Sequence, residues 1–421
     1  MIKNRNIWER PWEYKEGILI SITILILGFM LEFVTDGRGV LQLLEYPNNL
    51  YFGLGIILFL ILISITGRKW AVIEWLRSIP AAICSIGLLL FVSLLLGLTM
   101  QYDNSAPEII RKLGLSHVVS SWPYLLANLF LLLALGLTTI KNLVSFKWSK
   151  LGFIVSHLGL WIVLFGANFG SVQMQRLQME IPEGGINNRA TDKATNQVFT
   201  MPFAIKLVDF ILDEYTPKLA LVNNIEGTLH QGNGNDIILI DTTKTQTLEN
   251  WQITNEEYIY SSAKAGDKYY FVNEIGAAPS VFVSATNKNG KMVEGWISCG
   301  SYNRPYESLK LDEQFSLVML LPEPKEFTSI IEIYQKDENP IAINLEVNKP
   351  KVIGDWKIYQ LNYDSNMGRW SDTSVVELIK DPWLPVVYTG IFMMLVGALY
   401  MFWMGTKNKI AVVETKTNER D

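Results

Sequence analysis

The sequence predicts a membrane protein of the α+β class, with about six transmembrane helices and a large β-rich domain inserted between the fifth and sixth. We expect this domain to be an antiparallel sandwich or barrel-like fold. Hydrophobic residues make up 49% of the 421 residues, and they gather in runs long enough to cross about 30 Å of hydrocarbon as helices. One long stretch, 171–383, lacks such runs, and in it apolar and polar residues alternate as they do along β-strands. Cytosolic enzymes and disulfide-stapled secreted domains are therefore excluded.

The apolar runs place the six spans at about 17–34, 51–66, 79–99, 123–140, 151–170 and 384–404. The second span is short, so we expect it to extend by a few residues at either end. The first follows basic residues but lacks a small-x-small cleavage site, which favours a retained signal anchor. The predicted organisation is an N-terminal membrane domain of five helices, a β-rich domain, a C-terminal transmembrane helix and a cytoplasmic tail, at 1–170, 171–383, 384–404 and 405–421.

Lysine and arginine are distributed unevenly over the short loops, which predicts the orientation. With the N-terminus inside, the inner segments hold 14 of these residues and the short outer loops hold only Arg38, Arg111 and Lys112. Basic loops stay on the cytoplasmic side, so both termini are expected there and the β-rich domain outside. Residues 171–383 hold 19 Lys and Arg against 29 Asp and Glu. Nucleic acid is therefore not an expected partner.

Alternating or β-branched runs in the large domain predict strands at 236–242, 269–273, 280–285, 292–298, 315–321, 329–334, 341–347 and 356–363. Turn signals rich in Gly, Asn and Asp lie at 232–235, 287–290 and 337–340. No residue of this domain identifies itself as a binding or catalytic group.

Three histidines and two cysteines limit the metal chemistry of the chain. It has no Cys-x-x-Cys, no zinc-spaced cluster, no phosphate-binding Walker loop and no Gly-x-Ser-x-Gly motif. A quinol-oxidising dihaem cytochrome b needs four axial ligands, and the chain has only three histidines, so this class is disfavoured. Cys84 and Cys299 are expected on different sides of the bilayer, each as a small buried hydrophobe, so the chain cannot run disulfide exchange alone.

His157 is the foremost candidate for chemistry, because it lies seven residues beyond Lys150 in the fifth span, roughly 10 Å into the membrane. An imidazole at that depth needs a partner, which is either a functional ligand or an ordinary hydrogen bond to a neighbouring helix. Glycines at 152, 159 and 166 form a stripe that another helix can approach closely. His157 points nearly opposite to this stripe, with Trp161 one turn along on its own side.

The other polar candidates are weaker. His117 lies in the outer loop 100–122, in an amphipathic stretch at the interface, where a solvated side chain is commoner than a ligand. His230 stands beside a Gly/Asn turn of the β-rich domain and is expected to be solvated. Glu32, near the outer end of the first span, is expected to be wetted at the interface and structural.

Two stretches resemble the ResB (CcsB) family of cytochrome c biogenesis proteins, of the machinery called system II. The first combines Leu151–Leu160 with Pro202–Tyr215, and the second runs through Gly354–Asp364, Val375–Leu378 and Asp381–Gly390. The resemblance covers about 150–404. The first 145 residues depart from the family's commoner layout, since four spans rather than two precede the histidine span.

The resemblance implies a bacterial inner-membrane protein that works with a CcsA-type (ResC) membrane partner. Together they would move haem b to the outer side and deliver it for thioether attachment to apocytochrome c. His157 matches the family's transmembrane histidine, implied to be an axial ligand of the haem iron, with Trp161 and His117 as further cofactor-binding candidates. The chain alone would not be catalytic but a subunit of a holocytochrome c synthase complex.

Haem iron with two imidazole ligands needs histidines on both porphyrin faces, and this chain offers one at membrane depth. The second would come from the partner subunit or from His157 of a second copy. A hypothesis of another class remains open: a membrane-anchored periplasmic scaffold or envelope-assembly factor without haem, in which His157 is merely hydrogen-bonded among membrane lipids and neighbouring helices.

Overall fold

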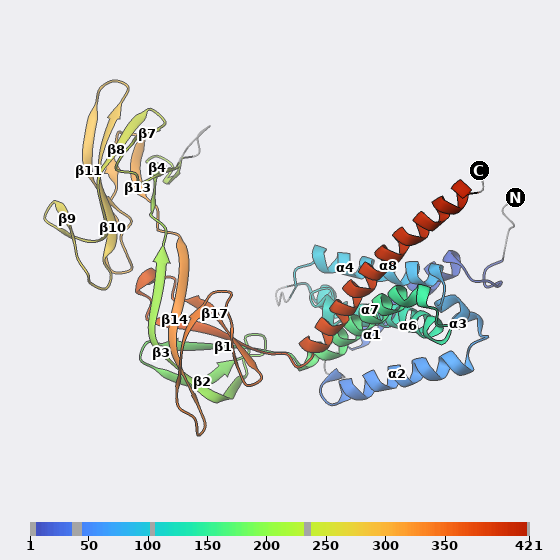
Figure 1. The fold of residues 1–421 in the computed structure, drawn as a ribbon. Coiled ribbons are helices and arrows are strands. Elements are labelled where there is room, and N and C mark those ends of the chain that lie inside the picture. Colours follow the sequence, from blue (N-terminus) through green and yellow to red (C-terminus); the bar gives the residue numbers. More distant parts are fainter. Residues whose placement is uncertain (1–5, 36–43, 102–105, 231–236, 419–421) are drawn as a thin grey trace. The chain divides into compact units, whose positions relative to one another are not determined.

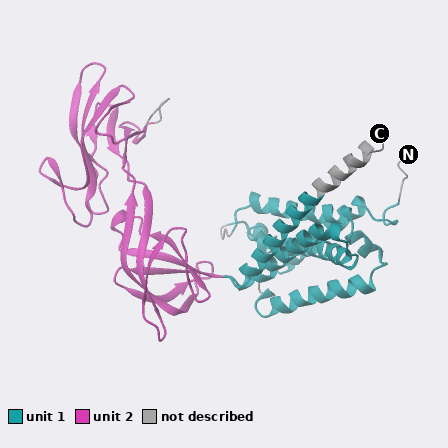
Figure 2. Cartoon of the chain, in the orientation of Figure 1, with its two compact units in different colours: residues 1–174, 381–421 teal, residues 175–380 magenta. Residues whose placement is uncertain are grey.

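The computed structural model describes residues 6–35, 44–101, 106–230 and 237–418, with side chains as far as residue 404 (Figure 1). The chain forms two compact units (Figure 2). Residues 1–174 and 381–421 make a helical unit, and residues 175–380 make a β unit. The turn predicted at 232–235, the basic residues Lys3, Arg5 and Arg38, and the side chains of the basic residues beyond 404 lie outside the described part.

Six helices of the described residues are long and apolar enough to cross a membrane, which together with the antiparallel β unit confirms the predicted fold class. They are α1 (Tyr14–Val34), α2 (Asn48–Thr66), α4 (Ile79–Leu98), α6 (Trp122–Val144), α7 (Leu151–Gly170) and α8 (Leu384–Asn418). Two short helices lie in the connections, α3 (Ala71–Leu76) and α5 (Glu108–Lys112).

The helix ends follow from local chemistry, and several of them lie a few residues from the predicted ends. Proline stands in the first turn of α4 and of α6, where its missing N–H leaves no helical bond unmade. Helix α2 begins at Asn48, three residues before the apolar run, as expected for this short span. Helix α8 continues through residues predicted as a tail, as far as Asn418, beyond the apolar stretch that ends at Met404.

Helices α7 and α8 pack face to face through glycines. A Cβ on Gly159 would lie 2.6 Å from the carbonyl oxygen of Gly390, and one on Gly397 would lie 2.5 Å from the backbone nitrogen of Ser156. Such distances leave no room for a side chain, so the two backbones touch. The predicted glycine stripe is therefore the contact face for α8, and His157 lies on the side of α7 away from it.

The β unit begins and ends in one antiparallel sheet of eight strands. Its order is β15-β14-β3-β2-β1-β18-β17-β16, and β15 also contacts β17, so the sheet curls into a nearly closed barrel. The core is formed by alternate apolar residues, which gather on one face because successive side chains of a strand point to opposite sides. The strands are β1 (Gln175–Pro182), β2 (Ile186–Thr191), β3 (Val198–Glu214), β14 (Pro324–Gln335), β15 (Ile341–Glu346), β16 (Lys351–Ile353), β17 (Trp356–Tyr363) and β18 (Thr373–Lys380).

Two smaller sheets share a second core, which includes Trp251, Val283 and Leu317. The first sheet contains β4 (Lys218–Asn223), β5 (Thr228–Leu229), β6 (Ile237–Leu239), β12 (Leu309–Lys310) and β13 (Phe315–Met319). The other contains β7 (Thr245–Leu248), β8 (Trp251–Ala265), β9 (Lys268–Phe271), β10 (Ala278–Asn287) and β11 (Met292–Ser298). The β unit thus has a barrel lobe and a two-sheet lobe, each with its own core.

The strand predictions are partly correct. The runs at 292–298 and 356–363 coincide with β11 and β17, whereas the run at 236–242 contains only the short β6. The long strands β3 and β8 and the terminal strands β1 and β18 were not predicted. In β3 the apolar alternation is interrupted where Val208 and Asp209 are both exposed, at an irregularity in the pairing with β14.

The two ends of the β unit leave it side by side. Gln175 of β1 pairs with Lys380 of β18 along an unbroken antiparallel register. In the helical unit the matching ends of α7 and α8 also meet, since the indole N–H of Trp383 donates to Oε1 of Gln173 at 2.9 Å. A single pair of neighbouring segments therefore connects the two units.

Substituting Gly159 with alanine should destabilise the helical unit by about 1–3 kcal/mol, because the new methyl group overlaps the α8 backbone. The matched control is Gly87→Ala in α4, where the added Cβ would meet nothing within 4 Å. Thermal unfolding of both purified variants in the same detergent measures the difference. Equal midpoints for the two would contradict a tight α7–α8 contact.

Candidate functional site

The imidazole of His157 is held in one orientation by its own helix. Its Nδ1 lies 2.9 Å from the carbonyl oxygen of Phe153, and the two rings stack with centroids 3.6 Å apart. A carbonyl oxygen can only accept, so the proton must reside on Nδ1 and the lone pair on Nε2. Among the described residues Nε2 forms no hydrogen bond, and the side chain is half-buried.

This arrangement has the donor chemistry of a metal-binding imidazole. Histidine ligands commonly donate their second ring N–H to a backbone carbonyl, which fixes the tautomer and the ring plane. His157 has that bond to Phe153, and its Nε2 is left available. The described residues contain no group of three or more His, Cys, Asp or Glu side chains that could hold a metal ion. His157 thus fits one axial position on haem iron rather than a complete metal centre.

Trp161 lies one turn from His157 but is committed to the interior of the helical bundle. Its indole N–H donates to the carbonyl oxygen of Leu132 at 3.1 Å, and its ring stacks on Phe165. It also packs against Leu60 and Leu137. Trp161 therefore ties α7 to α6 and α2, and sets the rotation of α7 that carries His157.

His117 is neither solvated nor close to His157. Its Nε2 lies 3.1 Å from Oε1 of Glu32, and the backbone N–H of Trp122 donates to the other carboxylate oxygen at 2.7 Å. The expectation that Glu32 is wetted is wrong, because the loop around Gly114 covers it and its side chain is fully buried. Glu32 thus binds α1, this loop and the first turn of α6 together.

His117 and His157 cannot share one haem iron within a single chain. Trp161 meets α6 at Leu132, ten residues beyond Trp122, which stands beside the His117–Glu32 pair. Ten helical residues span about 15 Å, much more than the separation of two axial ligands. The third histidine, His230, pairs with Glu249 at 2.8 Å in the β unit.

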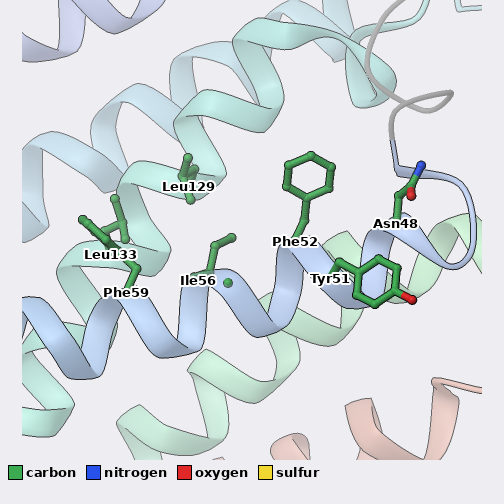
Figure 3. A pocket seen from close by; sticks show the side chains of 8 residues that line it. Asn48, Tyr51, Phe52, Ile56, Phe59, Leu129 and Leu133 are labelled. Atoms are coloured by element: carbon green, nitrogen blue, oxygen red, sulfur yellow. The ribbon is translucent and has the colours of Figure 1, made fainter.

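The helical unit carries an apolar groove between α2 and α6. Figure 3 shows Phe52, Ile56 and Phe59 of α2 alongside Leu129 and Leu133 of α6. The space that these residues line has a volume of about 550 Å³. No acidic, basic or histidine side chain lines it, so its chemistry suits hydrocarbon such as a lipid chain.

Sequence reasoning missed a pocket in the β unit, with polar and apolar lining residues and a volume of about 400 Å³. It is lined by Glu214, Cys299 and Arg369 among others, which lie far apart in the sequence. Burial raises the pKa of the Glu214 carboxyl group, while the nearby Arg369 opposes the shift. Burial also raises the pKa of the Cys299 thiol to about 12, so this thiol stays protonated.

Comparison with protein families gives one match. Residues 146–224 match the ResB-like family, a family associated with cytochrome c biogenesis, which supports the ResB (CcsB) assignment. The matched segment contains α7 with His157 and strands β1 to β4. The second stretch of the resemblance, from Gly354 onward, lies outside it. No curated protein matches the chain.

The Glu32–His117 contact should contribute more stability than the His230–Glu249 contact, although the same residue types meet at similar distances. We expect a coupling energy of about 1–3 kcal/mol for the buried pair, against under about 1 kcal/mol for the exposed pair. Double-mutant cycles to alanine, followed by thermal unfolding in detergent, measure both. Similar couplings would contradict the structural role of Glu32.

Cys299 should react slowly with iodoacetamide in the folded protein near neutral pH, because its raised pKa leaves very little thiolate. In a Cys84→Ser background it is the sole thiol, and mass spectrometry follows its alkylation. The rate should rise about tenfold per pH unit while the fold persists. Denaturant should restore fast reaction near neutral pH, and fast alkylation before unfolding would contradict the burial of this thiol.

Proposed function

With residues 146–224 matched to the ResB-like family, we propose that the chain is the haem-handling subunit of a system II cytochrome c biogenesis complex. With a CcsA/ResC-type membrane partner it transports haem b across the bacterial inner membrane. The complex then delivers the haem for covalent attachment to apocytochrome c. Haem is cargo in this proposal, shared with the partner subunit.

The observation that carries the proposal is the state of His157. Nδ1 is bound to the carbonyl oxygen of Phe153, and Nε2 is free of hydrogen bonds among the described residues. When bound, haem supplies an iron that takes such a nitrogen as an axial ligand. The chain's own contribution is to hold the imidazole in the correct tautomer, through Phe153, and to fix the rotation of its helix through Trp161.

The second axial ligand comes from another polypeptide. Along α6, His117 stands more than about 15 Å from the level of His157, and its Nε2 contacts Glu32, so it does not complete the iron coordination of His157. A histidine of the CcsA-type partner supplies the ligand, with His157 of a second copy as the competing source. The two sources predict different compositions for the haem-containing complex.

The orientation follows from the 14 basic residues on one set of loops and 3 on the other. Both termini lie in the cytoplasm, and the β unit lies in the periplasm or exoplasm, where apocytochrome c receives its haem. The chain does not run disulfide exchange alone, since its two cysteines, Cys84 and Cys299, lie in different units. It acts as one subunit of the thioether-forming haem lyase.

Replacing His157 with alanine should abolish or strongly weaken the Soret absorption of the protein co-purified with its CcsA-type partner. The loss is expected because iron loses one of its two axial nitrogens. Absorption spectra of complexes purified in mild detergent measure it, and imidazole added to the variant should restore part of the band. His230→Ala is the matched control and should leave the spectrum unchanged.

A Soret band unaltered by His157→Ala, in a folded complex of normal composition, would contradict the ligand role. It would favour the alternative of an anchored periplasmic scaffold, in which the histidine only stacks on Phe153. A haem-containing complex without the CcsA-type protein would instead point to paired copies of His157.

A further inference from the structure

The pocket of the β unit lies where its two lobes meet. Glu214 ends strand β3 of the barrel lobe, and the loop after β17 supplies Arg369 and Trp370. The two-sheet lobe contributes Pro279 and Cys299. Arg369 fastens the lobes together, since its guanidinium donates to the carbonyl oxygens of Tyr260 and Ala277 at 3.0 and 2.9 Å.

The walls are apolar and stiff. They are formed by three prolines and three aromatic rings, at Pro279, Pro322, Pro324, Tyr302, Tyr363 and Trp370. Such rings present large flat surfaces and lose little conformational freedom on binding. The indole of Trp370 is held in place by a 2.9 Å hydrogen bond to the carbonyl oxygen of Ala277. The walls are therefore suited to a flexible hydrocarbon chain rather than to a large polar group.

The carboxylate of Glu214 is an acceptor in this pocket that has no hydrogen-bond donor among the described residues. Arg369 already donates to two carbonyl oxygens, and its guanidinium lies over the Trp370 ring at 5.0 Å. Glu214 forms no hydrogen bond or ion pair with the described residues, although it is partly buried. The rest of the unit is acidic as well, with 29 Asp and Glu against 19 Lys and Arg in residues 171–383. The charge of Arg369 only partly offsets the burial of this carboxylate, whose pKa stays raised, so the ammonium group of a ligand would recover free energy by donating to it.

The local backbone keeps the space beside Glu214 open. Gly368 has a φ of +58°, a conformation that side chains rarely adopt, and its missing Cβ would lie 3.8 Å from Oε1 of Glu214. At the rim, Ser365 and Asn366 are exposed and offer polar groups to a passing peptide backbone. The volume of about 400 Å³ exceeds that of one side chain.

We propose that this pocket binds a lysine side chain of an extended polypeptide segment. The alkyl stem lies along the proline and aromatic walls, and the ammonium group reaches the Glu214 carboxylate, as long cationic side chains do on apolar surfaces. The identification of that polypeptide as an apocytochrome rests on the proposed function, whereas the recognition of lysine does not.

The test uses the full chain in nanodiscs and a ten-residue peptide of Gly and Ser with one central Lys. Saturation-transfer NMR on the peptide measures binding. The same peptide with norleucine keeps the stem without the charge, and butylamine presents the charge without the polypeptide. Glu214→Gln should weaken the binding of the lysine peptide by about tenfold or more, because one charge-assisted hydrogen bond is lost. Glu226→Gln, an exposed acid of the same unit, is the matched control.

The expected result is binding of the lysine peptide, weaker binding of both probes, and loss in Glu214→Gln alone. The proposal would be overturned if the lysine peptide did not bind, if the norleucine peptide bound equally well, or if Glu214→Gln bound the lysine peptide as tightly as the unaltered protein. Butylamine that binds as tightly as the peptide would overturn the polypeptide part. Should Glu214→Gln fail to fold, Ser365→Trp obstructs the rim from an exposed position and must also weaken binding. No peptide carries a haem-attachment motif, so this outcome is independent of the His157 spectrum.

Discussion

The contact between the backbones of α7 and α8 is the constraint on which the rest of the helical unit depends. Gly159 in α7 and Gly390 and Gly397 in α8 let the two helix backbones touch, where any larger residue would hold them apart. This contact occupies one face of α7 and turns the opposite face, with His157, away from α8. Trp161 then anchors α7 on α6, so the histidine has a defined direction within the bundle.

The helical unit was more predictable from the sequence than the β unit, for physical reasons. A span must be apolar along its whole length, so α7 was predicted with its observed ends at residues 151 and 170. A strand at the surface needs only every second residue to be apolar, and in β3 this alternation shifts by one residue at Val208, where the pairing with β14 is irregular. Strands of both kinds were missed, the long β3 and β8 as well as the short β2 and β4.

Some candidate residues could be identified from the sequence, and others only from the fold. His157 could be identified because an imidazole in a membrane span is unusual in itself. The burial of Glu32 could not, because it depends on how the loop before α6 folds over the end of α1. The pocket with Glu214 and Arg369 is likewise a product of topology. Residues near 214, 299 and 369 converge only after β3 pairs with β14 and the chain returns from the second lobe.

The pairing of Gln175 with Lys380 gives the β unit a modular character. Its two ends emerge as adjacent strands, so the whole of 175–380 is an insertion into a helical hairpin formed by α7 and α8. Insertions with neighbouring ends can be exchanged or lengthened with little disturbance to the host. The helical hairpin can therefore keep its glycine contact and its histidine when the domain between them is exchanged or lengthened.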